Sequence, residues 1–316
     1  PDFEAVIREL EQMAGGWGET GVRPAAPPLA PAKPASGPAR SASQIPLVAA
    51  GALLMAVLAA GVIYMVRSGP EDPASTKNAT STPAKAAPEP RFSDAFGEMV
   101  LVPAGKYGSG EQQVEKEVAG FYVDRTEVTV GAWNRFSQAT GAQPKVGAPE
   151  NYPVTDVTFD EAAAYCQWAG RRLPAADEWE KAARGADGRK YPWGNDEDPT
   201  RANVAGNSQI PPNRLQPVEA LPTGASPYGA LHMAGNAWEW VRQDGQPKDP
   251  SLRGLVDERM RQAKLAPLTP EDVWFVVRGG GYDFALGGAV SWEHAPVPAR
   301  FKSPAIGFRC VRDLDR

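Results

Sequence analysis

Cysteine and histidine are scarce in this chain of 316 residues, which contains two of each. Cys166 and Cys310 have no second cysteine and no histidine at metal-ligand spacing, which excludes the usual thiolate and histidine metal sites. The net charge of −5 and the lack of a basic stripe with interleaved aromatic residues exclude nucleic acid as a partner. The two cysteines leave two interpretations open, a pair of buried thiols or one long-range disulfide in an oxidising compartment.

Residues 1–17 contain a short amphipathic pattern. Apolar residues recur at helical spacing and predict a helix over residues 2–13, with one apolar stripe made of Phe3, Val6, Ile7, Leu10 and Met13. This stripe resembles the closing helix of a bacterial Ser/Thr protein kinase domain. The chain has no Gly-rich loop, no His-Arg-Asp and no Asp-Phe-Gly motif, so any kinase activity would lie upstream.

Residues 45–66 carry no charged side chain. About 20 apolar residues are enough to cross a bilayer core as a helix, so we expect a single transmembrane helix here. A secretory signal peptide is the competing interpretation, and the 44 residues that precede the run disfavour it. Ala52, Ala56 and Ala60 form a small-xxx-small ridge that favours a dimer through this helix, unless the ridge only reflects an alanine-rich composition.

Two linkers flank this segment, at residues 18–44 and 67–91. Both are rich in proline and alanine, which is typical of extended or disordered connections. Lysine and arginine occur on both sides of the uncharged run, so charge alone does not predict which side faces the cytoplasm.

Residues 92–316 have the pattern of a globular domain. Strand-like pieces occur at 99–103 and 121–129, and helices are expected over 130–136, 158–168 and 175–184. Thr158-Phe-Asp-Glu161 is a capping box that predicts where the second helix begins. The remaining segments are rich in Gly, Pro, Asn and Trp, so much of this domain is expected to be loop. Such a domain needs cross-links from a disulfide, bound ions or buried tryptophans.

Several short motifs occur in order along this domain. They are Gly97-Glu-Met-Val-Leu-Val-Pro-Ala-Gly105, Val123-Asp-Arg-Thr-Glu-Val-Thr129, Tyr152-Pro-Val-Thr-Asp-Val-Thr158, Ala162-Ala-Ala-Tyr-Cys-Gln-Trp-Ala-Gly-Arg-Arg-Leu-Pro174, Glu178-Trp-Glu180, Tyr191-Pro-Trp-Gly-Asn195, Gly235-Asn-Ala-Trp-Glu-Trp240, Val277-Arg-Gly-Gly280 and Ile306-Gly-Phe-Arg-Cys310. Together they resemble the formylglycine-generating enzyme (sulfatase-modifying factor) family. The resemblance implies an α+β domain, a variant of the C-type-lectin-like fold with little regular secondary structure.

The resemblance also implies a pairing for the two cysteines. In disulfide-bearing members of the family, the cysteines that match Cys166 and Cys310 are bonded to each other. A disulfide implies an oxidising compartment, so the domain is expected outside the cytoplasm and the N-terminus inside.

The family's oxidase chemistry needs residues that this chain lacks. Family enzymes oxidise a peptide cysteine with oxygen through a cysteine pair that binds copper(I), because soft thiolates suit that ion. The corresponding stretch, residues 281–300, contains no cysteine, so no copper is expected. It contains Trp292 and His294, and His294 beside Glu293 is read as a surface residue rather than a new site with Asp283. The iron-dependent sulfoxide synthases of this fold use a His-x-x-x-His-x-Glu pattern that is also missing.

Family members bind structural calcium, and oxygen ligands suit Ca²⁺. The resemblance implies one site at Gly235, Ala237 and Glu239, and another that begins at Asn203 and Val204. At the first site His232 replaces a common family asparagine and is a poor calcium ligand, and at the second site the loop of residues 205–216 is short. Hydrogen bonding in a turn and in the core is the other interpretation of these residues, and both stay open.

These observations predict a membrane-anchored, extracytoplasmic domain that binds a protein, peptide or small ligand without catalysis. It would be the sensor part of a membrane Ser/Thr kinase. Two alternatives stay open, an active protein-modifying oxidoreductase of the same family and a structural scaffold of the cell envelope. Residues 243–274, with a charged helix expected over 250–265, are an elaboration near the rim of the family's peptide groove, where partner specificity could lie.

Overall fold

The computed structural model describes residues 88–247 and 250–314. The predicted helix at 1–17, the linker at 18–44, the predicted spanning segment at 45–66 and most of the linker at 67–91 lie outside this range. Within the described part of the chain, no helix is both long and apolar enough to cross a membrane.

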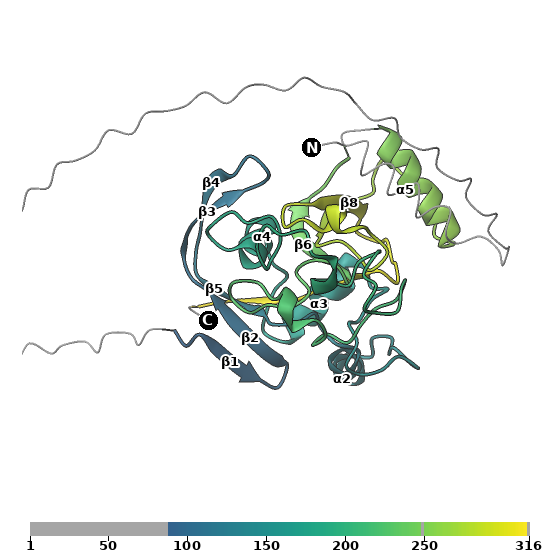
Figure 1. Ribbon diagram of the computed structural model, residues 1–316. Helices are drawn as coiled ribbons and strands as arrows, with labels where there is room; N and C mark the ends of the chain where they lie inside the picture. Colours follow the sequence, from purple (N-terminus) through teal and green to yellow (C-terminus); the bar gives the residue numbers. More distant parts are fainter. Residues whose placement is uncertain (1–87, 248–249, 315–316) are drawn as a thin grey trace, which may run out of the picture. The chain divides into compact units, whose positions relative to one another are not determined.

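The first sheet joins the beginning and the end of the domain. Its strand order is β1-β2-β5-β10, with β1 at Arg91–Asp94, β2 at Gly97–Val102, β5 at Phe121–Asp124 and β10 at Val311–Asp313. All pairings are antiparallel, and Val100, Val123 and Val311 stand opposite one another across three strands. These valines are fully buried, so a cross-strand apolar row fixes the register. Figure 1 shows β10 beside β5, far from it in sequence.

The second sheet has the order β8-β7-β6-β9. It contains β6 at Trp238–Asp244, β7 at Trp274–Arg278, β8 at His294–Pro298 and β9 at Ile306–Gly307. The pairings are antiparallel except for the short parallel contact between β6 and β9. A separate hairpin is formed by β3 at Gly105–Ser109 and β4 at Val114–Val118. The architecture is therefore α+β, as the resemblance implied.

The local sequence explains where two of the helices begin. The capping box at Thr158 is confirmed, and it starts α3 at Phe159–Trp168. Thr129 caps α2, which runs over Val130–Thr140 and is a turn longer than expected, because Gly141 provides the left-handed C-cap with φ 79°. Helix α4 spans Ala176–Arg184.

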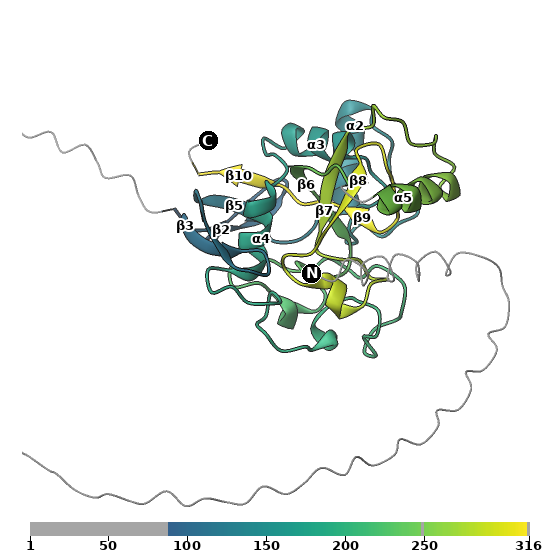
Figure 2. The same ribbon diagram turned by 90° about the horizontal axis from the view of Figure 1, so that it is seen from above.

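The charged helix α5 occupies Pro250–Gln262. It ends earlier than the expected residue 265, because Lys264 adopts a left-handed backbone with φ 57° that does not continue a helix. Short 3-10 turns complete the elements as η1 at Pro199–Arg201, η2 at Pro222–Gly224 and η3 at Leu286–Ala289. Figure 2 shows α5 beside β8 and β9 of the second sheet.

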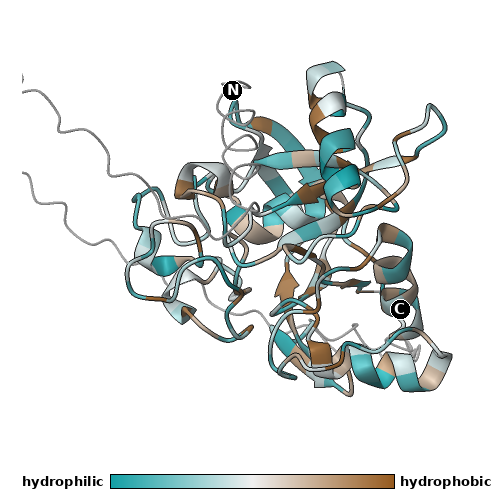
Figure 3. Ribbon diagram, turned by 90° about the vertical axis from the view of Figure 1, so that its right-hand side faces the viewer, coloured by the Kyte–Doolittle hydropathy of each residue, from teal (hydrophilic) through white to brown (hydrophobic). Residues whose placement is uncertain are grey.

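Aromatic side chains form much of the core. Trp133, Tyr165 and Phe308 contact one another with ring centroids 5.4–6.3 Å apart, and they belong to one buried cluster with Cys166 and Cys310. Figure 3 shows apolar segments, in brown, on strands inside the ribbon and polar residues, in teal, along outer loops and helices. Buried aromatic contacts thus hold together a domain with long irregular segments.

A disulfide joins Cys166 on α3 to Cys310 beside β10, across 144 residues of sequence. Both cysteines are fully buried, and their Cα atoms are 5.7 Å apart. The pairing that the resemblance implied is confirmed, and the alternative of two free buried thiols is excluded.

Removing this bond should destabilise the domain strongly. The chain-entropy model gives about 4–5 kcal/mol for closing a loop of this length, so we expect Cys166→Ala with Cys310→Ala to lower the free energy of unfolding by an amount of that order. Urea unfolding followed by tryptophan fluorescence measures the loss. Adding a reductant to the double variant is the control and should change nothing. An unchanged midpoint in the variant would contradict the prediction.

Candidate functional site

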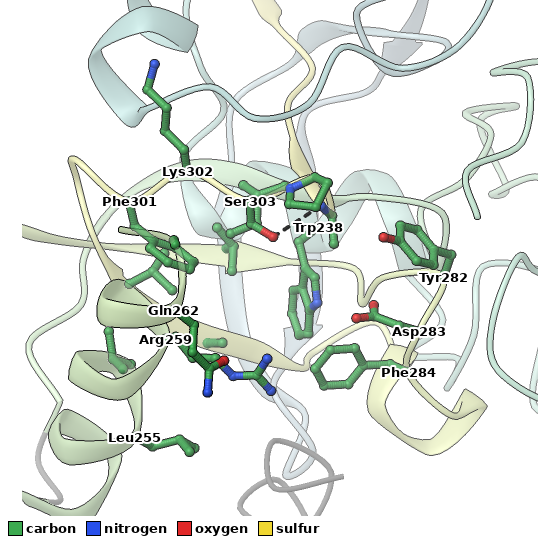
Figure 4. Close-up of a pocket in the computed structure, with 18 residues that line it drawn as sticks. Trp238, Leu255, Arg259, Gln262, Tyr282, Asp283, Phe284, Phe301, Lys302 and Ser303 are labelled. Atoms are coloured by element: carbon green, nitrogen blue, oxygen red, sulfur yellow. Dashed lines mark hydrogen bonds between the residues drawn. The ribbon is translucent and has the colours of Figure 1, made fainter. Parts of the chain in front are cut away.

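A cavity of about 570 Å³ lies between α5 and the second sheet. This volume falls in the range of about 300–1,000 Å³ that is typical of small-molecule sites. Two further segments complete the walls, residues 282–284 and residues 301–306 (Figure 4). The lining residues are Trp238, Leu255, Val256, Arg259, Gln262, Ala263, Val277, Tyr282, Asp283, Phe284, Ala295, Val297, Phe301, Lys302, Ser303, Pro304, Ala305 and Ile306.

Apolar side chains form most of the pocket wall. Trp238, the first residue of β6, packs edge-on against Phe284 with ring centroids 5.1 Å apart. Leu255 and Arg259 are four residues apart on α5, so they lie on the same helical face. The elaboration that the sequence placed at the rim of the family's groove therefore forms one wall of this pocket.

Three of the polar residues in the lining are already engaged. Lys302 Nζ donates to Glu161 Oε1 at 2.8 Å, and Gln262 Nε2 donates to Glu258 Oε1 at 3.2 Å. Ser303 Oγ accepts from the backbone N–H of Ala305 at 3.2 Å. In Figure 4 Lys302 points away from the pocket. The other ionisable residues of the lining are Arg259, Asp283 and Tyr282.

Burial dominates the electrostatics of these three residues. It raises the pKa of Asp283, although the charge of Arg259 opposes the shift. It lowers the pKa of Arg259, although the charge of Asp283 opposes that shift. The pKa of Tyr282 rises to about 12, first through burial and then through Asp283. The Oδ1 atom of Asp283 is buried and has no hydrogen-bond partner within the described residues.

The pocket includes part of the stretch where the family resemblance implies a copper-binding cysteine pair. Tyr282, Asp283 and Phe284 from this stretch line the cavity, and both cysteines of the chain are in the disulfide. His294 is exposed on β8, and its backbone N–H donates to Glu293 Oε1 at 3.2 Å. The part of the chain that the structure describes has no group of three or more His, Cys, Asp or Glu side chains arranged to hold a metal ion.

The predicted calcium residue Glu239 is engaged by other side chains. Arg309 Nη2 donates to Glu239 Oε1 at 2.6 Å, and Arg309 Nε donates to Oε2 at 2.7 Å. Trp179 Nε1 also donates to Oε2, at 2.6 Å. All three side chains are fully buried. The Glu239 carboxylate is thus the counterion of Arg309, and its predicted role as a calcium ligand stays a prediction.

The structure brings the other predicted calcium residues close together. Asn203 forms a bridge with Gly235, and the Asn203 carbonyl accepts from the Asn236 N–H at 2.8 Å. The Asn203 side chain donates to Asn236 Oδ1 at 2.8 Å. Val204 and Ala237 are both buried. These contacts match the turn and core hydrogen bonding that the sequence left open beside calcium.

Sequence reasoning missed two residues, Arg309 in the core and Arg259 in the pocket wall. Arg309 lies inside the Gly-Phe-Arg-Cys motif but received no role, and Arg259 was only one charge on a predicted helix. The partners of Arg309 are far away along the chain, so local patterns carry no signal for them. The apolar spacing on α5, with Leu255 and Val256 a turn before Arg259, was the one signal for the pocket wall.

Comparison with known proteins assigns the domain. A family model described as "Sulfatase-modifying factor enzyme 1-like domain" matches residues 84–314. The chain belongs to this family. A hercynine oxygenase from Mycolicibacterium smegmatis is 38% identical over 156 residues, which cover 46% of this chain and 35% of that protein. An inactive C-alpha-formylglycine-generating enzyme 2 from Bos taurus is 38% identical over 128 residues, which cover 38% and 42% respectively.

The matched segments thus span well under half the length of these two relatives. A formylglycine-generating enzyme from Mycobacterium tuberculosis is 32% identical over 187 residues, which cover 55% of this chain and 61% of that protein. Among solved structures, PvdO from Pseudomonas aeruginosa has a TM-score of 0.57 at 23% identity and covers 72% of this chain and 100% of that one. This likeness shows the shared fold.

The buried histidine of the domain gives a pH prediction. The pKa of His232 falls from 6.5 to about 4, through burial first and the charge of Arg309 second. Its Nε2 atom is buried without a hydrogen-bond partner within the described residues. Between pH 4 and 6.5 the unfolded chain binds more protons than the folded chain, because His232 stays neutral only when it is buried. The stability that depends on neutral His232 is therefore full above about pH 6.5 and is lost as the pH falls through 4. We expect wild type to lose about 3 kcal/mol from pH 7 to 4 relative to His232→Asn.

Asparagine suits this test because residue 232 has a left-handed backbone with φ 54°. Urea unfolding at pH 7, 5.5 and 4 gives the difference between the two proteins. His294→Asn, at the exposed histidine of β8, is the matched control and should follow wild type. Equal pH dependence of wild type and His232→Asn would contradict the prediction.

Proposed function

We propose that residues 92–316 form a non-catalytic ligand-binding module of a single-pass membrane protein. The observation that carries the proposal is the chemistry of the pocket. Tyr282, Asp283 and Phe284 line it in the stretch where the family resemblance implies copper(I)-binding thiolates, and both cysteines are in the disulfide. A mostly apolar wall with a few polar groups is typical of a binding pocket. The relative from Bos taurus that is named inactive supports such a member of the family.

In this proposal residues 92–316 lie outside the cytoplasm, and residues 1–44 lie in the cytoplasm. The uncharged run at 45–66 supports the anchor, and the buried disulfide supports an oxidising compartment. In this arrangement a ligand bound in the pocket is read out across the membrane. The kinase-like stripe at residues 1–17 supports an upstream kinase domain as the proposed output. Pairing of two chains through Ala52, Ala56 and Ala60 is the proposed route by which the signal crosses the membrane.

Labelling of single added cysteines tests the topology. Val146 has 88% of its surface exposed, so Val146→Cys offers an accessible thiol on the domain. With the full chain expressed in bacterial cells, a membrane-impermeant maleimide should label Val146→Cys in intact cells. Ser41→Cys, on the other side of the uncharged run, is the matched variant and should react only after lysis. The reverse pattern would contradict the proposed topology.

The absence of oxidase activity is tested separately. The full chain, loaded with copper(I) and supplied with a cysteine-containing peptide, should consume no oxygen above the level of the peptide and copper alone. Turnover that depends on the protein would overturn the non-catalytic assignment and favour the oxidoreductase alternative.

A further inference from the structure

Aromatic side chains from three segments meet in the pocket between α5 and the second sheet. Trp238 begins β6, and Phe301 follows β8. Tyr282 and Phe284 follow β7, and the Phe284 ring packs edge-on against Trp238. Aromatic rings attract one another beyond what the burial of their area contributes. The wall of this pocket therefore favours a ligand that has a ring system of its own.

The charged side chains of the lining are already compensated within the described residues. Lys302 pairs with Glu161 at 2.8 Å and points away from the pocket in Figure 4. Arg259 has an interaction partner, and its charge also attracts Asp283. The Oδ1 atom of Asp283 is buried beside Gly281, where an added Cβ would lie only 2.8 Å from it. A charged ligand would lose hydration without gaining a free counterion, so the pocket favours a neutral ligand.

The hydroxyl of Tyr282 is a polar group of the lining that can still bind a ligand. Burial first, and then the charge of Asp283, raise the pKa of Tyr282 to about 12, and no hydrogen bond contributes to this shift. The phenol is therefore neutral at physiological pH and can donate a hydrogen bond. In Figure 4 the hydroxyl end of Tyr282 points toward Trp238. A ligand carbonyl beside Trp238 would accept this hydrogen bond.

We propose that this pocket binds a neutral aromatic molecule that carries a carbonyl group. Its ring system lies against Trp238 and Phe284, and its carbonyl oxygen accepts from the Tyr282 hydroxyl. The cavity of about 570 Å³ is large enough for a two-ring system. The proposal rests on the proposed function as a ligand-binding module and names the class of its ligand.

Calorimetry with the full chain in lipid nanodiscs tests the preference for a neutral ligand. Three probes share a naphthalene ring and differ only in one substituent, which is a methyl ketone, a carboxylate or an aminomethyl group. Naphthyl methyl ketone should bind saturably, whereas its partition into lipid is linear and is subtracted with empty nanodiscs. Naphthoate and naphthylmethylammonium should bind at least about tenfold more weakly, because each brings a charge that finds no free counterion.

Two further probes test the carbonyl and the ring. Isopropenylnaphthalene has the shape of the ketone with a CH₂ group in place of the oxygen, so it should bind about fivefold to tenfold more weakly. Decahydronaphthyl methyl ketone keeps the carbonyl on a saturated ring system. It should bind about threefold to tenfold more weakly than the aromatic ketone, because it makes no ring contacts with Trp238 and Phe284.

A variant assigns the carbonyl contact. Tyr282→Phe should weaken naphthyl methyl ketone about fivefold to tenfold and should leave isopropenylnaphthalene unchanged, since only the ketone loses a hydrogen bond. This split separates the loss of one contact from damage to the pocket. Tyr228→Phe is the matched control, because Tyr228 is a partly buried tyrosine that packs on another cluster and lies outside the lining. It should bind the ketone like wild type.

Three results overturn the proposal. The first is the absence of saturable binding of the aromatic ketone to wild type, which needs no variant to fold. The second is binding of naphthoate, naphthylmethylammonium or the saturated ketone as tight as that of the aromatic ketone. The third is equal weakening of ketone and isopropenylnaphthalene by Tyr282→Phe. The second and third results leave the ligand-binding function intact, and the topology and oxygen-consumption experiments test that function independently.

Discussion

The buried guanidinium of Arg309 is the interaction on which the rest of this domain depends. It donates to both oxygens of Glu239 on β6, to the carbonyl of Asp124 at the end of β5 and to the carbonyl of Leu231. Arg309 and Glu239 are both fully buried, and a buried charge without its counterion costs several kcal/mol. The two sheets and the loop at residue 231 are therefore held in one arrangement by a single side chain.

The residue beside it adds a covalent connection. Cys310 is bonded to Cys166 on α3, and its backbone N–H donates to Asp124 Oδ2 at 2.8 Å. Asp124 is also paired with the buried Arg171, which follows α3. The short segment 306–310 thus connects both sheets to α3. This frame explains how a domain with so much irregular backbone keeps a defined pocket on its second sheet, since β9 of the same segment forms part of the pocket wall.

Local patterns predicted the parts of this structure that depend on local physics. The capping box at Thr158 and the charged helix expected over 250–265 concern residues within one or a few turns of each other, so the sequence was sufficient to predict that these helices exist. The disulfide followed from resemblance to a family. The pairing of Arg309 with Glu239 joins residues 70 positions apart, and no periodicity or propensity encodes it. Glu239 was therefore expected as a calcium ligand from its motif, whereas its two oxygens accept from Arg309 and Trp179.

Family membership and pocket chemistry carry different kinds of information. The buried groups that hold the fold together, such as Arg309 and the disulfide, do not line the pocket. The pocket is lined in part by α5 and by residues 282–284, where this chain has aromatic and charged side chains and no thiol. The buried groups therefore support the assignment of the fold, and the pocket residues support the proposed loss of oxidase chemistry.

A double-mutant cycle on Arg309 and Glu239 tests the central role of this buried pair most directly. The free energies of unfolding of Arg309→Met, Glu239→Gln and the double variant are compared with wild type by urea denaturation of the full chain in micelles. The account predicts that each single change costs about 3–5 kcal/mol and that the double change costs at least about 2 kcal/mol less than the sum. Single costs below about 1 kcal/mol that simply add would contradict it.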